Sequence, residues 1–381
     1  SGGGRNARRG PRESEADHIQ DPHLRASTPQ VTRRLALTAL NPHPTSLTPT
    51  PSTHQAAQRC ARKESTVQTN NRGIVIAVGG NALIKKKNQI STDNQSEAIR
   101  ETCTYIADIV EQGYNPVITH GNGPQVGFLL RRAELALGEL PAIPLDVLGA
   151  DTQGATGYLF ARNLRNVLTE RSIECHIAAI VTQSVVDPDD PAFDSPTKPI
   201  GSFMDEQEAE KHRVEDGWVV KEDAGRGFRR VVASPQPIDI IELGIIKSLI
   251  SSGVMVIAAG GGGIPVTREN GTIRGREAVI DKDLASSLLA NSLEVEDFII
   301  CTAVDQVYLD FNSPTQRGIS TMTADEAAGY LTAEQFGSGS MAPKIEAAIK
   351  FLENGGQRVI ITSLDRLADA LDGKAGTTIT N

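Results

Sequence analysis

The stretch "IVIAVGGNAL" (74–83) is an apolar run that ends in two glycines and an asparagine. Runs rich in Val and Ile are typical of strands buried on both faces of a parallel sheet. The pattern occurs twice more, in "PVITHGNGPQVG" (116–127) and "VMVIAAGGGGIPV" (254–266). A glycine after a strand lets backbone N–H groups approach an anion without a Cβ in the way. The three glycine breaks together predict a phosphate-binding edge, although a tight turn would explain any one of them alone.

From residue 71 onward, strand patterns alternate with amphipathic helical patterns such as "SEAIRETCTYIADIVEQG" (96–113) and "DLASSLLANSL" (283–293). The expected strands are 74–78, 116–119, 176–181, 254–258, 297–302 and 358–362. Buried strands separated by helices predict an α/β fold with a mainly parallel central sheet and helices on both faces.

Residues 184–232 do not follow this alternation. The stretch "VVDPDDPAFDSPTKPIGSFMDEQEAEKH" (185–212) is crowded with Asp, Pro and Gly. A long insertion in a compact enzyme is often a lid or a binding loop, so we predict a lid here. A surface insertion without function is the alternative.

Composition divides the chain of 381 residues, whose net charge is −9, into two parts. Residues 1–70 hold seven of the 20 prolines and ten Lys and Arg against five Asp and Glu, without apolar periodicity. We expect this segment to be a disordered leader, either non-native or targeting, because no methionine precedes Met204. The acidic remainder argues against nucleic-acid and membrane partners. No segment has transmembrane length.

The four cysteines, Cys60, Cys103, Cys175 and Cys301, are scattered and form no C-x-x-C pair. This spacing suits a reducing compartment and provides no zinc site. We therefore expect a cytoplasmic protein, or one of an organelle matrix if the leader is a transit segment.

Two lysines stand where helices are expected to begin. Lys282 lies in "VIDKDLASSLL" (279–289), and Lys344 follows a proline in "GSGSMAPKIEAAIKFL" (337–352). A cation at a helix N-terminus opposes the helix dipole unless an anion shares the site. Asp281 and Asp283 flank Lys282 and could hold it while capping the helix. Lys198, in "TKPIGS" (197–202), is a weaker third candidate; ordinary surface lysines are the alternative for all three.

The polar groups near the glycine breaks narrow the chemistry. We find no Ser/His/Asp arrangement, metal-ligand cluster or activated cysteine, and we expect His120 to be structural. Backbone N–H groups, lysines and a few carboxylates suit phosphoryl transfer, in which the protein mainly positions reactants and neutralises charge.

The motifs "VGGNAL", "HGNGPQVG", "DPAFDSPTKPIGSF", "RRVVASPQP", "AAGGGGIPV", "EAVIDKDLAS" and "GSMAPKIEAA", in this order, resemble the carbamate kinases of the amino-acid kinase superfamily. The resemblance covers residues 73–381. It implies a three-layer αβα sandwich, a homodimer and the reversible reaction ATP + carbamate ⇌ ADP + carbamoyl phosphate. It also implies a role in arginine catabolism, in the direction of ATP, with Mg²⁺ carried by the nucleotide and no metal held by the protein alone.

The resemblance further implies two lobes. The carbamate-binding lobe would span 71–245, including the lid at 184–232, and the nucleotide-binding lobe would span 246–381. The implied catalytic residues are Lys198, Lys282, Asp283 and Lys344. Those implied for the transferred phosphoryl group and the carbamate are Gly79, Gly80, Asn81, Gly121, Asn122 and Gly123. Those implied for the nucleotide are Gly260, Gly261, Gly262, Gly263, Asp305, Tyr308 and Met341.

The chain departs from the family pattern after KPIG, where Pro-Phe-Tyr is usual and Ser202-Phe203-Met204 stands here. Ala233 also replaces a frequent Pro. The lid is therefore the part whose behaviour we expect to differ most.

The sequence leaves two alternatives open: a kinase of another small carboxylate, and a nucleotide-binding protein that has lost catalysis. The KPIG stretch argues against the first, and the three lysines together argue against the second.

Overall fold

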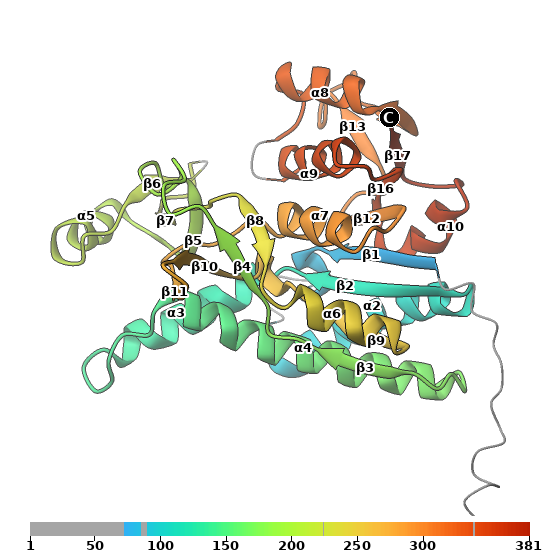
Figure 1. Cartoon of the computed structure of the whole chain (residues 1–381). Coiled ribbons are helices and arrows are strands. Elements are labelled where there is room, and N and C mark those ends of the chain that lie inside the picture. The colour runs from blue at the N-terminus through green and yellow to red at the C-terminus, as the bar shows by residue number, and fades with distance from the viewer. Residues whose placement is uncertain (1–71, 85–89, 224, 338–339) are drawn as a thin grey trace, which may run out of the picture. The chain divides into compact units, whose positions relative to one another are not determined.

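The computed structural model of the chain describes residues 72–84, 90–223, 225–337 and 340–381 (Figure 1). The predicted leader, residues 1–70, lies outside the described residues.

An eight-stranded sheet forms the centre of the fold, in the order β15-β17-β16-β12-β1-β2-β9-β3. Its neighbouring strands pair in parallel, except that β16 and β17 are antiparallel. All six expected strands are present, and β15 and β17 are additional. The bounds are β1 Arg72–Val78, β2 Tyr114–His120, β3 His176–Ala179, β9 Val254–Ile257, β12 Asp297–Thr302, β15 Thr321–Thr323, β16 Arg358–Ser363 and β17 Thr377–Thr380.

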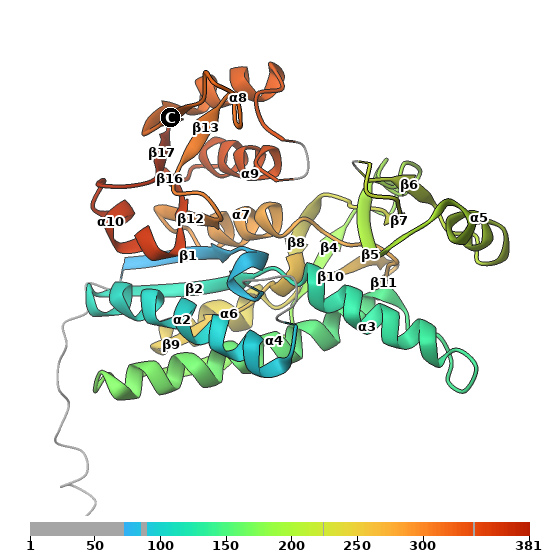
Figure 2. The same ribbon diagram turned by 180° about the vertical axis from the view of Figure 1, so that it is seen from behind.

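Helices cover both faces of this sheet (Figures 1 and 2). Side chains alternate along the central strand β1: Ile74, Ile76 and Val78 pack with α2, α4 and α10, whereas Val75 and Ala77 pack with α6, α7 and α9. Both sets are fully buried, as expected for a strand with a period of two between two helical layers. The three-layer αβα prediction is confirmed.

The helices of the two layers have the following bounds. They are α2 Thr92–Glu111, α4 Leu145–Glu170 and α10 Leu367–Leu371 on one face, and α6 Leu243–Ser251, α7 Lys282–Ser292, α8 Ala324–Thr332 and α9 Ala342–Glu353 on the other. Helix α4, of 26 residues, was not predicted, because Gly149, Gly154 and Gly157 interrupt its apolar pattern.

Smaller elements complete the fold. A four-stranded sheet has the order β11-β10-β4-β8, and β13 pairs with β14. The bounds are α3 Gly123–Ala136, β4 Gln183–Val186, β8 Pro237–Ile240, β10 Ile264–Glu269, β11 Thr272–Gly275, β13 Val307–Leu309 and β14 Arg317–Ile319, with 3₁₀ turns η1 Gly80–Ala82, η2 Gly260–Gly262 and η3 Leu364–Arg366.

The predicted insertion forms a separate small layer. It consists of the three-stranded sheet β5-β7-β6 (Lys198–Met204, Phe228–Val232 and Val220–Glu222) and helix α5 (Glu206–Glu215). In both views it stands to one side of the central sheet, next to α3 (Figures 1 and 2). We call residues 198–232 the lid. The first residues of the predicted insertion belong instead to β4.

The predicted boundary between two lobes at residue 245 stays a prediction. The central sheet is continuous across it, since β9 lies between β2 and β3.

Close packing and backbone conformation require glycine at positions 260–263. Gly261, Gly262 and Gly263 have φ of 68°, 97° and 88°, in the left-handed region that favours glycine. A Cβ at Gly263 would lie 2.0 Å from the Ser184 Oγ, and one at Gly260 would lie 2.5 Å from the His120 ring. The segment thus crosses between β9 and β10 where no side chain fits.

We predict that Gly263→Ala lowers the free energy of unfolding by roughly 2–4 kcal/mol, because the new Cβ combines left-handed strain with overpacking. Gly244→Ala is the control: that glycine is exposed in helix α6, and apart from its chain neighbours and the backbone of its own helix, no described atom lies within 4 Å of its Cβ position. It should leave stability unchanged or raise it by up to about 1 kcal/mol. Equal stability of both variants in urea titrations would contradict the packing argument.

Candidate active site

Two of the glycine breaks meet at the carboxyl ends of neighbouring strands. Val78 of β1 pairs with His120 of β2, and the Gly121 N–H donates to the Val78 carbonyl at 3.0 Å. A Cβ at Gly121 would lie 3.5 Å from both the Gly80 nitrogen and the Lys282 Cδ. The turn after β1 and the turn after β2 therefore lie together beside the start of α7, as the strand pattern predicted.

A cavity of about 700 Å³ opens at this edge. It is lined by residues from the turns after β1 and β2, from α3, from the lid and from the first turns of α7 and α9. The predicted site residues among them are Gly80, Gly121, Asn122, Gly123, Lys198, Gly261, Lys282, Asp283 and Lys344.

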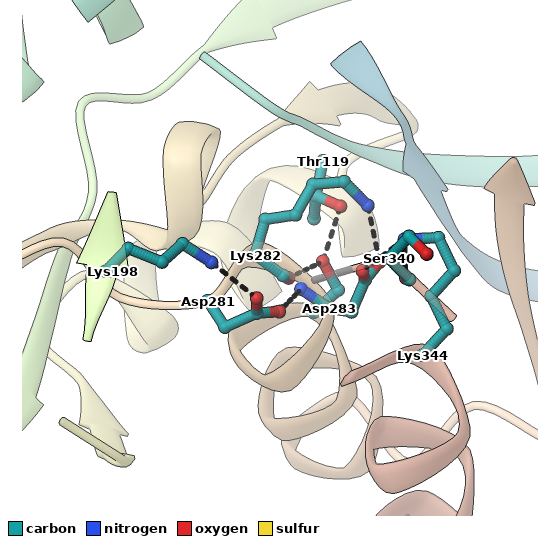
Figure 3. A network of polar contacts seen from close by, with 8 residues as sticks. Thr119, Lys198, Asp281, Lys282, Asp283, Ser340 and Lys344 are labelled. Atoms are coloured by element: carbon teal, nitrogen blue, oxygen red, sulfur yellow. Dashed lines mark hydrogen bonds and ion pairs between the residues drawn. The ribbon is translucent and has the colours of Figure 1, made fainter. Parts of the chain in front are cut away.

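Asp283 organises the two lysines at the helix starts (Figure 3). Its Oδ1 accepts a short hydrogen bond from Lys282 Nζ, and its Oδ2 accepts from Lys344 Nζ at 2.9 Å. Only 4% of the Asp283 side chain is exposed, and 13% and 14% of the two lysine side chains. Two ammonium groups thus share one buried carboxylate, which leaves a positive charge for an anionic ligand.

Burial on its own would raise the pKa of Asp283, but the charges of Lys282 and Lys344 outweigh it and hold the pKa below its usual value. The carboxylate is therefore ionised whenever both lysines are charged. A further chain of bonds fixes the first turn of α7, since Ser286 Oγ donates to the Lys282 carbonyl and lies 2.6 Å from Thr119 Oγ1 of β2.

Three helix N-termini border the same cavity. Helix α3 begins at Gly123, α7 at Lys282 and α9 at Ala342, and residues of each first turn line the cavity. The N–H groups at a helix start carry a partial positive charge, roughly half an elementary charge per helix. Together with the lysines, they make the cavity suited to a polyanion such as a phosphate group.

Lys198 comes to the site from the lid, as its first β5 residue (Figure 3). Its Nζ donates to Asp281 Oδ2 at 2.8 Å, and Asp281 Oδ1 accepts from the Asp283 N–H at 2.9 Å. The expectation that both flanking aspartates would hold Lys282 was therefore half wrong: Asp283 holds it, whereas Asp281 caps α7 and binds Lys198.

A second cavity, of about 550 Å³, adjoins the first. The two share Gly80, Ser340 and Lys344, and the second is also lined by Gly79 and by Cys301–Ala303 at the end of β12. Ligands in the two cavities would thus meet at the turn after β1.

The other predicted site residues lie outside the lining of the 700 Å³ cavity. Gly260, Gly262 and Gly263 pack against protein atoms, and Met341 packs on the apolar core under α9. Tyr308 Oη donates to Asp305 Oδ1 at 2.6 Å. Asn81 lies in η1, but its side chain is outside the described residues.

Sequence reasoning missed two arginines that line the cavity. Arg131 extends from α3, and Arg229 lies on β7, where it donates to Asp223 Oδ2 and to the Gly201 carbonyl, each at 3.2 Å. Arg229 Nε is buried and has no hydrogen-bond partner among the described residues. The pair "RR" at 229–230 could have indicated a cationic group near the site, but the insertion showed no strand pattern that would place it there.

The departures after KPIG have different surroundings. Met204 is buried in the small core of the lid, with Ala209, Val220, Trp218 and Phe228. Ser202 lines the cavity. Ala233 is buried and pairs with Ala278, just after β7. The replaced Tyr position therefore belongs to lid packing.

His120 and Cys301 do not act as acid–base groups here. Burial lowers the pKa of His120 to about 4, and its Nδ1 lies 3.0 Å from the Gly121 carbonyl. The ring also stacks on Phe160. Burial raises the pKa of Cys301 to about 12, so its thiol stays protonated. Both are structural near neutral pH, as expected for His120.

The described residues show neither a metal-binding cluster nor a membrane-spanning helix. Within 72–381, apart from the gaps, no group of three or more His, Cys, Asp and Glu side chains is arranged to hold a metal ion. Among the helices of the same residues, none is long and apolar enough to cross a membrane.

Comparison with known proteins gives consistent matches. The sequence profile of the amino acid kinase family matches residues 72–363. The carbamate kinase of Pyrococcus horikoshii is 47% identical over 309 residues, which cover 81% of this chain and 98% of that protein. The carbamate kinase of Clostridium perfringens is 46% identical, over 80% of this chain and 99% of that protein.

A solved structure is similar as well. Carbamate kinase from Giardia lamblia bound to AMP-PNP has a TM-score of 0.77 and 42% identity, and the match covers 82% of this chain and 99% of that one. These matches confirm the resemblance predicted from the motifs.

The pKa of His120 predicts how stability depends on pH. The unfolded His120 takes up a proton as the pH falls below about 6.5, whereas the folded form does so only near 4. The free energy of unfolding should therefore fall as the pH decreases from 6.5 to 4, by up to about 3 kcal/mol from this group. His120→Asn should flatten this part of the curve, and His176→Asn, at an exposed position of β3, should not. Parallel curves for His120→Asn and the unmodified protein would contradict the assignment.

Proposed function

The chain belongs to the amino acid kinase family, and from this premise we propose that it catalyses the carbamate kinase reaction, the reversible transfer of a phosphoryl group between ATP and carbamate. The observation that carries the proposal is the pair of lysines held by Asp283 at two helix N-termini. Phosphoryl transfer depends on positioned positive charge far more than on acid–base groups.

On the acceptor side, we propose that Gly121, Asn122 and Gly123 contact carbamate at the start of α3, with Lys198 reaching it from the lid. These residues line one cavity with Lys282 and Lys344. Carbamate and carbamoyl phosphate are anions, so a site built from lysines and helix N-termini offsets their repulsion from the nucleotide phosphates.

On the donor side, we propose that the nucleotide phosphates lie at Gly79, Gly80 and Asn81, within reach of Lys344. The neighbouring second cavity supports this arrangement, because it shares Gly80 and Lys344 with the acceptor cavity. The sequence resemblance would place Asp305, Tyr308 and Met341 at the nucleoside. Of the four-glycine segment, only Gly261 reaches the lining of the acceptor cavity.

In the direction of ATP formation, a β-phosphate oxygen of ADP attacks the phosphorus of carbamoyl phosphate. The P–O bond to the carbamoyl group breaks, its electron pair stays on the carbamate oxygen, and a new P–O bond completes ATP. Lys282 and Lys344 would stabilise the charge on the moving phosphoryl group and the leaving oxygen. Carbamate leaves as an anion, so no protein base is needed, which agrees with a site without an acid–base histidine.

We propose that Mg²⁺ enters with the nucleotide. Mg²⁺ is commonly held by substrate phosphates with few protein ligands. The two carboxylates that line the cavity, Asp281 and Asp283, are already bonded to lysines. The phosphate oxygens of ATP would therefore supply the ligands, and the ion would neutralise part of their charge.

The experiment that tests the reaction is ATP formation from ADP, Mg²⁺ and carbamoyl phosphate by the full chain. Lys282→Ala and Lys344→Ala should each lower kcat by roughly 10²–10³-fold, because a positioned charge in such a site is worth about 2.7–4 kcal/mol. Lys211→Ala, at an exposed lid position, is the control and should keep the full rate.

Near-full rates in both lysine variants would contradict the charge argument. A protein that binds ADP but turns over no carbamoyl phosphate would point to an inactive nucleotide-binding protein. Turnover of another acyl phosphate alone would point to a different carboxylate acceptor.

We further propose a homodimer through the outer face of α4 and the edge strand β3. β3 ends the central sheet, so one of its sides has no neighbouring strand in that sheet. Helix α4 packs on β3, with Gly157 close to Ala179, and leaves Val147 and Tyr158 45% and 57% exposed. Exposed apolar side chains beside an open strand edge are typical of an interface between protein chains.

Tyr158→Glu should shift the protein from dimer to monomer, because a charge would be buried in the interface. Val214→Glu, at a lid position that is 74% exposed, is the control and should leave the mass unchanged. Sedimentation velocity at several concentrations measures both. A monomeric unmodified protein, or a dimer that survives Tyr158→Glu, would contradict the proposed interface.

A further inference from the structure

The ion pair between Lys198 and Asp281 joins the lid to the helix that carries two catalytic residues. Lys198 Nζ lies 2.8 Å from Asp281 Oδ2, although 83 residues separate them in the chain. The lysine side chain is 35% exposed and the aspartate side chain 14%. The ion pair therefore links a partly exposed side chain of the lid to a mostly buried side chain at the start of α7.

The direction of the Asp281 carboxylate is fixed by the fold. Its Oδ1 accepts from the Asp283 N–H at 2.9 Å as the N-cap of α7. Because the helix backbone holds Oδ1, the position of Oδ2 is fixed as well, and Oδ2 accepts the hydrogen bond from Lys198. The ammonium of Lys198 is thereby placed relative to Lys282 and Asp283, the next two residues of the same turn.

A second contact attaches the lid to the same short segment. The Val279 N–H donates to the Ala233 carbonyl at 2.9 Å, directly after the last lid strand. Residues 279 and 281 thus hold two neighbouring lid strands at the same end of the lid sheet, because Lys198 of β5 pairs with Val232 of β7.

A lysine has three N–H donors, and its long flexible stem carries about 2 kcal/mol of rotamer entropy. One donor reaches Asp281, which leaves donors that can face the cavity Lys198 lines. We propose that Asp281 is a positioning residue: it docks the lid lysine onto the start of α7, so that Lys198 is oriented for the anionic acceptor before that acceptor binds. The inference deepens the proposed carbamate kinase function and rests on it.

Two roles of Asp281 must be separated, the helix cap and the lysine partner. Asn caps a helix as well as Asp does, but it lacks the charge that binds an ammonium group. Asp281→Asn therefore removes the second role and keeps the first. Asp205→Asn is the matched control, because Asp205 caps the lid helix α5 in the same way, accepting from the Glu208 N–H at 2.8 Å.

The kinetic test uses the full chain, with ADP and Mg²⁺ saturating and carbamoyl phosphate varied. Asp281→Asn should lower kcat/KM for carbamoyl phosphate by roughly ten- to a hundredfold, as loss of a charge-assisted hydrogen bond would. The KM for ADP should change little, and Asp205→Asn should match the unmodified protein. In a Lys198→Ala background, Asp281→Asn should have no further effect, because its partner is already gone.

Trp218, the single tryptophan of the chain, gives a measurement that needs no turnover. It lies in the lid, stacked on His212, and lines a small cavity between the lid and α3 together with Arg131 and Ile200. Weaker docking of the lid should expose it. Quenching of its fluorescence by acrylamide should therefore increase in Asp281→Asn and in Lys198→Ala, to the same degree in the double variant, and not in Asp205→Asn.

Unchanged quenching and unchanged kcat/KM in Asp281→Asn would overturn the proposal. If Asp281→Asn further lowered kcat/KM or further increased quenching in the Lys198→Ala background, the proposal would also be overturned, since Asp281 would then act through α7 alone. An unmodified protein without turnover would refute the proposed function instead, and the quenching result would still decide whether Asp281 docks the lid.

Discussion

The shared carboxylate of Asp283 is the interaction on which the site depends. The ammonium groups of Lys282 and Lys344 both bond to Asp283, so they lie close together and repel each other strongly in an enclosed site. Each also opposes the dipole of the helix that carries it. One buried carboxylate offsets part of this cost. In the proposed reaction, a phosphate group bound beside the two lysines would offset the remainder.

The surrounding fold brings backbone close enough for this network to form. The turns after β1 and β2 have glycine where a side chain would meet Gly80, Lys282 or the end of β12. The glycines at 260, 261 and 263 pack closely against His120, Asn122 and Ser184, respectively. Gly261 lines the cavity as well. The four-glycine segment thus packs against the turn after β2 and also reaches the cavity.

The sequence predicted what local patterns encode. Apolar runs located the six main strands, and proline and aspartate at helix starts located Lys344 and Lys282. The pairing of Lys198 with Asp281 was not predictable, because it joins residues 83 positions apart through the docking of a lid whose strands have no clear period. Arg131 and Arg229 were missed for the same reason: their side chains reach the cavity only through the packing of α3 against β5. The long α4 was not predicted because glycines interrupt its apolar pattern. One of them, Gly157, is required by the close contact of α4 with β3.

The positive charges of the site lie on elements of different kinds. Lys282 and Lys344 lie in the first turns of α7 and α9, which pack on the central sheet, and their side chains are nearly buried. Lys198 begins a strand of a small sheet with its own core, and its side chain is more exposed. In the proposed reaction, the charge that would stabilise the transferred phosphoryl group therefore lies on helices packed against the central sheet. The charge proposed for the acceptor lies on the lid and would be in place only while the lid is docked, so the proposed role of Asp281 would couple acceptor binding to the position of the lid.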